Sequence, residues 1–179
     1  MVVSGPRSLC AHALPSRLTI EPGDLVNVEV CGVHHRYHTS LARSLSIGTP
    51  QHGVAEYAAK AADGARLAAQ AIRPAQPVDE LLAVLQDYYQ RAGIWADRWW
   101  IGGYELGIAF PPDTVGEFYY EYEREPGDKM FEPGVVCKFE SNFYLPDSAG
   151  LMVSTNTKAF TEATAEFLNE LPPDLIVVE

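Results

Sequence analysis

The chain has 179 residues, of which 47% are hydrophobic and 21% are charged, a composition typical of one globular domain. Its net charge of −11 offers no basic face to a nucleic acid or an anionic membrane. No apolar run reaches the ~20 residues that span a bilayer, and the first residues lack the pattern of a secretory signal. We therefore expect a small-molecule substrate, with no nucleic-acid partner and no membrane partner.

The three cysteines are Cys10, Cys31 and Cys137, which are far apart and include no CxxC pair. An odd number with this spacing argues against a disulfide framework and against a thiolate zinc site. Cys31 and Cys137 lie in strand-like runs, so we expect both to be small buried hydrophobes. Free thiols are typical of a reducing compartment, and we expect a cytoplasmic protein.

The first predicted elements are strands. Val2 and Val3 are typical of the end of a strand, and residues 23–45 predict two strands joined by a polar turn that carries His34 and His35. Between Asp24 and Arg43 the only carboxylate is that of Glu29. This hairpin is therefore poor in ligands for hard metal ions.

Two helices follow the hairpin. Residues 51–72 are rich in alanine, with apolar positions at helical spacing, and we expect Thr49 to cap this helix with Pro50 at its first position. A second helix is predicted over residues 78–92, with acidic residues in its first turn and Gly93 at its end. Both helices are better explained as scaffold than as sites.

From residue 94 the pattern favours strands. Three glycines surround Tyr104 within residues 101–108, which predicts close backbone approach beside a cleft floor. Residues 115–122 alternate aromatic and acidic side chains, as in a half-exposed hairpin arm, and residues 135–144 and 150–160 predict two further strands. The fold class is therefore α+β, a curved and mostly antiparallel sheet with two helices on one face.

Glu140 lies inside the apolar strand predicted over residues 135–144. Strand alternation places it on the same face as Lys138 and Asn142, with Phe139 and Phe143 on the other face. If Glu140 faces the core, it needs a cation, a hydrogen-bond donor or a ligand, because burying an unpaired charge costs several kcal/mol. If it faces solvent, its position carries no functional meaning.

An ordered set of short motifs resembles the creatinase, aminopeptidase P and prolidase family, whose catalytic domain has the pita-bread fold. The motifs are Ser4-Gly5, His12, Gly23-Asp24, Tyr37 to Arg43, Arg73-Pro74, Gly103 to Gly107, Glu132-Pro133-Gly134, Glu140 and Gly150. The resemblance implies that residues 1–179 form a partial catalytic domain that is incomplete at its N-terminus. The first helices and the separate N-terminal domain of many family members would then be absent.

The resemblance also implies where metal ligands would stand. Family members that use metal bind two ions through two Asp, one His and two Glu. These five positions fall on Glu29, Ser40, Tyr104, Glu140 and Ser154. Hard divalent ions need several carboxylates, so we expect no metal and no other cofactor.

One branch of the family, which includes creatinase and ectoine hydrolase, is similar in having lost metal ligands. By this resemblance His12 is the proton-transfer residue, since an ordinary imidazole titrates near pH ~6.5. Glu140 would be catalytic with it and would hold a cationic amidine, and Glu29, His38 and Tyr104 would bind the substrate. Family substrate-binding residues are replaced by Ala42 and His38, which argues against creatine itself.

The resulting prediction is a metal-independent hydrolase of a C–N bond in a small amidine, guanidino or amide substrate. Two alternatives remain open: a truncated pseudoenzyme, and a binder of small molecules or peptides that uses the same cleft without turnover. A metallopeptidase that acts on Xaa-Pro peptides is disfavoured by the missing ligands. Whether the chain is a monomer or a homodimer is left open.

Overall fold

The computed structural model describes residues 1–108, 118–123 and 127–179. Its strands are β1 (Val2–Ser4), β2 (Leu25–His34), β3 (Tyr37–Ile47), β4 (Arg98–Leu106), β5 (Tyr119–Glu121), β6 (Val136–Tyr144), β7 (Leu151–Met152), β8 (Ser154–Phe160), β9 (Ala165–Phe167) and β10 (Ile176–Val178). Its α-helices are α1 (Val54–Ala71) and α2 (Val78–Ala92), and short 3₁₀ turns cover Gly5–Leu9, Trp95–Asp97 and Pro146–Ser148.

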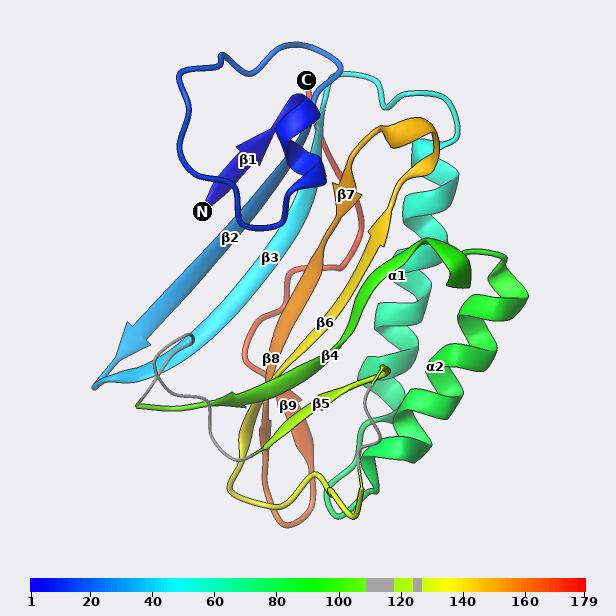
Figure 1. Cartoon of the computed structure of the whole chain (residues 1–179). Coiled ribbons are helices and arrows are strands. Elements are labelled where there is room, and N and C mark those ends of the chain that lie inside the picture. Colours follow the sequence, from blue (N-terminus) through cyan, green and yellow to red (C-terminus); the bar gives the residue numbers. More distant parts are fainter. Residues whose placement is uncertain (109–117, 124–126) are drawn as a thin grey trace.

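The described strands form one sheet in the order β1-β2-β3-β8-β6-β4-β5, and outside this order β7 pairs with β6, β9 with β8 and β10 with β3. Every pairing is antiparallel except that of β10 with β3, which is parallel. Figure 1 shows the sheet as a twisted, cupped layer with both helices on one side. The predicted α+β architecture is confirmed.

The helices cover the sheet face that carries the aromatic residues of β6. Phe139 and Phe143 are buried there with the apolar sides of α1 and α2, and Tyr89 of α2 reaches across to Ser141 with an oxygen–oxygen distance of 2.5 Å. Because side chains alternate along a strand, Lys138, Glu140 and Asn142 must lie on the opposite face. The polar face of β6 thus lies on the concave side of the sheet.

The hairpin of β2 and β3 turns at His35 and Arg36, whose φ angles are both positive, 47° and 73°. Two successive left-handed residues are typical of the tight turn that matches the twist of a hairpin. His34 and His35 are exposed there, as expected. Cys31 is exposed as well, so the prediction that it is buried was wrong, because the end of β2 extends beyond its pairing with β1. Cys137 is buried, as predicted.

The predicted start of α1 was also wrong. The helix begins at Val54 after Gly53, whose φ of 80° sets the chain direction, and no side chain caps it. Thr49 and Pro50 precede the helix by a turn. The predicted end of α2 is confirmed, because Gly93 adopts the left-handed conformation with a φ of 76°.

The arm expected over residues 115–122 lies partly outside the described residues, and its end forms β5. None of the described helices is both long enough and apolar enough to cross a membrane.

Candidate functional site

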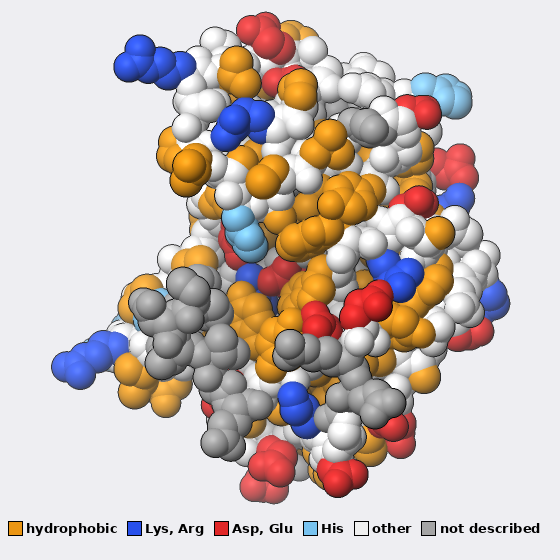
Figure 2. All heavy atoms as spheres, viewed as in Figure 1, with side chains coloured by type: hydrophobic (Ala, Val, Ile, Leu, Met, Phe, Trp, Pro, Cys, Tyr) orange, Lys and Arg blue, Asp and Glu red, His pale blue; other side chains and the backbone are white. Residues whose placement is uncertain are grey.

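The concave face of the sheet carries a group of polar side chains that come from five strands. The register pairs Glu140 of β6 with Thr155 of β8 and with Gly102 of β4, and it pairs Ala42 of β3 with Glu29 of β2. In antiparallel pairs, residues directly opposite share a face. Figure 2 shows the result as a hollow near the middle of this face, where acidic, basic and histidine side chains meet.

Lys138 lies at the centre of this group. Its Nζ is 2.9 Å from Oε1 of Glu29 and 2.5 Å from Oε1 of Glu140, and it donates a hydrogen bond of 3.0 Å to the hydroxyl of Tyr104. The side chain of Lys138 is only 4% exposed. An ammonium has three protons to donate, so these three acceptors account for all of them.

The charges of the cluster stabilise one another. Burial alone would lower the pKa of Lys138, but Glu140 and Glu29 outweigh burial and raise that pKa above its ordinary value. Burial raises the pKa of Glu29, but the Lys138 ammonium and hydrogen bonds from Lys138 and Ser40 outweigh it and lower the pKa overall. The lysine is therefore a fixed cation at neutral pH, and Glu29 is an anion.

Further hydrogen bonds hold both carboxylates in place. Ser40 donates to Oε1 of Glu29 over 3.0 Å, and Asn142 donates to Oε2 of Glu140 over 2.8 Å. The amide oxygen of Asn142, Oδ1, accepts from the backbone N–H of Ser154 over 3.2 Å. Oε2 of Glu29 accepts no hydrogen bond from any described residue, so it remains available to a ligand.

His12 lies at the rim of the same hollow. It lines a small pocket together with Glu29, Glu140, Asn142, Thr155 and Trp99, and its ring packs edge-on against Trp99 with 6.4 Å between centroids. The cavity volume is about 20 Å³, which is enough for a water molecule but not for a substrate. The structure thus brings together three of the five predicted site residues, His12, Glu29 and Glu140, around this pocket.

Tyr104 joins the group through Lys138. Burial raises the pKa of its hydroxyl above the ordinary value, and the opposing effect of Lys138 is smaller. The hydroxyl therefore stays protonated, and its own hydrogen has no acceptor among the residues that the structure describes. Gly103 beside it is required for space, because a Cβ there would come within 1.8 Å of the backbone oxygen of Lys138.

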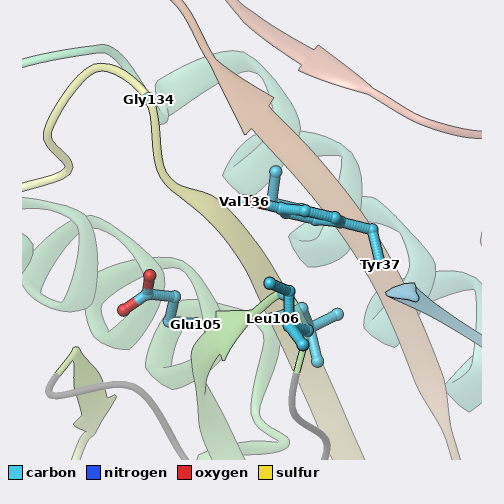
Figure 3. A pocket seen from close by; sticks show the side chains of 7 residues that line it. Tyr37, Glu105, Leu106, Gly134 and Val136 are labelled. Atoms are coloured by element: carbon cyan, nitrogen blue, oxygen red, sulfur yellow. The ribbon is translucent and has the colours of Figure 1, made fainter. Parts of the chain in front are cut away.

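His38, the fifth predicted site residue, lies further along the cleft. Its backbone N–H donates to the carbonyl of Gly107, and its Nδ1 lies 2.9 Å from the same oxygen. A larger pocket of about 300 Å³ opens at this end of β4 and β6. Figure 3 shows Tyr37, Leu106 and Val136 at this pocket, two residues along the strands from Tyr104 and Lys138. The larger pocket is thus separate from the charged cluster around Lys138.

The donor set does not fit a pair of divalent metal ions. Across residues 1–108, 118–123 and 127–179, no three His, Cys, Asp or Glu side chains come together as a metal-binding group. The two carboxylates that do converge share one ammonium. The hydroxyl of Ser154, which the sequence resemblance assigned to a metal-ligand position, is buried without a hydrogen-bond partner among these residues. Neutral hydroxyls and a lysine offer little to hard cations.

Sequence reasoning missed the central role of Lys138. The available signal was its place on the same strand face as Glu140, two residues earlier. What the sequence does not show is that Glu29, 109 residues away, reaches the same ammonium.

Residues 1–162 match metallopeptidase family M24. The probable dipeptidase PepE of Mycobacterium tuberculosis is 27% identical over 179 residues, which are 99% of this chain and 46% of that protein. The ectoine hydrolase of Halomonas elongata is 25% identical over 178 residues, which are 99% of this chain and 43% of that protein.

Among solved structures, the dipeptidase PepE of Mycobacterium ulcerans superposes with a TM-score of 0.86 at 24% identity, over 99% of this chain and 46% of that one. The structural likeness confirms the predicted pita-bread type of fold. The chain spans less than half the length of these relatives. Because the family match covers most of the chain, the protein belongs to metallopeptidase family M24.

Proposed function

We propose that this chain forms the cleft of a metal-independent hydrolase that cleaves a C–N bond in a small amidine, guanidino or amide substrate. The observation that carries the proposal is the meeting of His12, Glu29 and Glu140 at one pocket. An imidazole beside two fixed carboxylates is a suitable group to activate a water molecule. The 25% identity to an ectoine hydrolase supports this substrate class over an unrelated chemistry.

His12 moves the proton in this proposal. Its neutral imidazole takes a proton from water as the oxygen attacks the substrate carbon, and it returns that proton to the nitrogen as the C–N bond breaks. His12 is exposed at the rim, where a substrate approaches from solvent, and the pocket behind it has room for the attacking water. The proton count balances, since water supplies one hydrogen to the nitrogen and its hydroxyl to the carbon.

The charge of the cluster selects the substrate. Glu29 and Glu140 carry two negative charges and Lys138 carries one positive charge, so one negative charge remains. A single amidinium or guanidinium group would neutralise it, with Oε2 of Glu29 as the open acceptor. The hydroxyl of Tyr104 supplies a donor on the other side of Lys138, suited to an oxygen of the substrate.

The test is an assay of the purified chain with cyclic amidines, guanidino acids and N-acylated diamino acids in the presence of EDTA. We expect turnover that EDTA does not reduce. His12→Ala should lower kcat by about 10²- to 10⁴-fold, the usual contribution of a general acid–base group. His34→Ala is the matched control, because His34 lies on the exposed turn and should leave turnover unchanged.

A peptidase is the second candidate, because the relatives include probable dipeptidases and Xaa-Pro dipeptidases. Activity on dipeptides that EDTA abolishes and Mn²⁺ restores would favour this candidate and reject metal independence. Turnover that survives in His12→Ala would reject His12 as the proton-transfer residue.

A cytoplasmic location also stays a proposal, supported by the three free cysteines.

A further inference from the structure

The cluster around Lys138 differs from an ordinary buried ion pair in its composition. Two carboxylates from β2 and β6, which β3 and β8 separate in the sheet order, converge on one ammonium at 2.9 and 2.5 Å. Like charges held so close repel, and both Glu29 and Glu140 are largely withdrawn from water, with side chains 17% and 12% exposed. Such a pair needs a cation between its members.

In a metallopeptidase family, the cation expected between cleft carboxylates is a divalent metal ion. Here the position is filled by a side chain of the chain itself. Nζ of Lys138 also contacts Tyr104, so the ammonium has three oxygen neighbours at 2.5 to 3.0 Å. Oxygen ligands at 2.3–2.6 Å are typical of Ca²⁺, and those of smaller divalent ions are shorter. Only with the ammonium removed would small side-chain movements bring these oxygens to the distances of a metal site.

We infer that Lys138 is an internal cation that takes the place of a metal ion and excludes divalent ions from the cleft. Lys138 is a positioning residue in this arrangement, since its three protons go to Glu29, Glu140 and Tyr104 and none is left for a substrate. It sets the spacing of the carboxylates and leaves the hydroxyl hydrogen of Tyr104 free for another acceptor. The inference goes beyond the proposed function, because it holds whether or not the chain turns over a substrate.

The test replaces the internal cation and asks whether a metal ion enters. Wild-type protein and the Lys138→Met variant are desalted after incubation with Mn²⁺, their bound manganese is measured by mass spectrometry, and their Tm is measured in Mn²⁺ and in EDTA. We expect wild type to retain less than about a tenth of an equivalent and to melt at the same temperature in both. Lys138→Met should melt roughly 5–10 °C higher in Mn²⁺, when the ion is about a hundredfold above its Kd.

Two controls separate metal entry from loss of structure. Lys158→Met removes another buried lysine, whose ammonium binds the carbonyl of Ala69 away from the cluster, and it should gain no response to Mn²⁺. The double variant Lys138→Met with Glu140→Gln removes one carboxylate with the cation and should lose the response again. If Lys138→Met folds only when Mn²⁺ is present, that outcome supports the inference as well.

Either of two results would overturn the inference. One is stoichiometric manganese in the wild type, which would mean that Lys138 does not exclude metal. The other is a Lys138→Met variant that is indifferent to Mn²⁺, whether folded or unfolded in both conditions. Neither result depends on the hydrolase assay, so the inference and the proposed function can fail separately.

Discussion

Two buried lysines on neighbouring strands show what surroundings do to the same side chain. Lys138 of β6 meets two carboxylates, and its pKa lies above the ordinary value. Lys158 of β8 donates to the carbonyl of Ala69 and lies 4.4 Å from the ring centre of Phe167. Burial, reinforced by the charge of Arg73, lowers the pKa of Lys158 to about 8. The buried lysine that carboxylates surround thus holds its proton more firmly than the one that lacks them.

The ion pair of Glu29 predicts a dependence of stability on pH. The pKa of Glu29 is lower in the folded chain than its ordinary value of 4.5, so the folded state binds this proton less readily than the unfolded state does. The carboxylate therefore stabilises the fold fully above about pH 4.5 and loses this contribution as pH falls through the folded pKa. Glu29→Gln should lower the free energy of unfolding at pH 7 by roughly 1–3 kcal/mol.

Urea unfolding of wild type and Glu29→Gln at pH 7 and at pH 3 measures this effect. We expect the difference between the two proteins to be large at pH 7 and smaller at pH 3. A difference that is equal at both pH values would contradict an ionic contribution from Glu29. Ser40→Ala keeps the charge and removes one hydrogen bond to it, so it should show a smaller loss, about 1 kcal/mol.

At the scale of single residues, the sequence predicts that a buried side chain requires an interaction partner, but it does not identify which residue is that partner. Alternation correctly assigned the faces of β6, and it followed that Glu140, if buried, requires a cation or a donor. The partner that meets this need, Lys138, stands on the same strand. Glu29 completes the pair only because the cupped sheet brings β2 toward β6. The approach of β2 to β6 depends on the twist of the whole sheet, and no local sequence pattern predicts that twist.

At the scale of elements, the contact between α1 and α2 depends on one glycine. A Cβ at Gly64 would lie 2.2 Å from ring atoms of Tyr89. Tyr89 is fully buried, and its hydroxyl is held by Ser141 of β6, so the ring cannot withdraw. The glycine that weakens α1 by propensity thus allows the two helices to approach the sheet together.

Gly64→Ala therefore tests whether packing outweighs helix propensity. Alanine favours an exposed helix interior by about 1 kcal/mol over glycine, whereas overpacking a rigid core costs about 1–3 kcal/mol. We expect a net loss of stability, read as a lower urea midpoint at an unchanged slope. Ala59→Gly, at an exposed position inside α1, calibrates the propensity alone. A more stable Gly64→Ala variant would show that Tyr89 is able to move.

The elements that sequence reasoning missed share a physical cause. β9 and β10 have three residues each and exist through their pairing with β8 and β3. Too few residues alternate in them for a pattern to be visible. The start of α1 was misplaced for a related reason, since Thr49 and Pro50 fit a helix start locally while the left-handed Gly53 decides the direction of the chain.

At the scale of the whole molecule, one buried side chain ties the C-terminal segment to the centre of the sheet. Arg43 of β3 is 3% exposed. It donates to the carbonyls of Ala42 and Thr155 within the sheet and to those of Leu171 and Pro172 in the segment that follows β9. This segment then forms β10, the parallel partner of β3. The strand patterns predicted the fold class. They did not predict the pairing of β10 with β3, because residues 161–175 show no strand alternation that leads up to it.

Arg43→Met should therefore release the C-terminal segment before the rest of the chain. The methionine fills similar space but leaves four carbonyls without their charged donor, and for the buried bonds to Ala42 and Thr155 the cost is roughly 1–3 kcal/mol each. Hydrogen exchange followed by mass spectrometry should show protection lost in residues 168–178 and largely retained in α2. Arg43→Lys should give an intermediate result, because an ammonium donates three hydrogen bonds from one point where the guanidinium donates five in a plane.

Arg66 provides the matched control for this prediction. It pairs with Asp174 in the same C-terminal segment, but its side chain is 41% exposed, and exposed ion pairs contribute about 0–1 kcal/mol. Arg66→Ala should thus leave the exchange of residues 168–178 nearly unchanged. If Arg43→Met instead lost protection evenly over α2 and the C-terminal residues, the segment would belong to the same cooperative unit as the core. Arg43 would then stabilise the sheet as a whole and not the C-terminal segment alone.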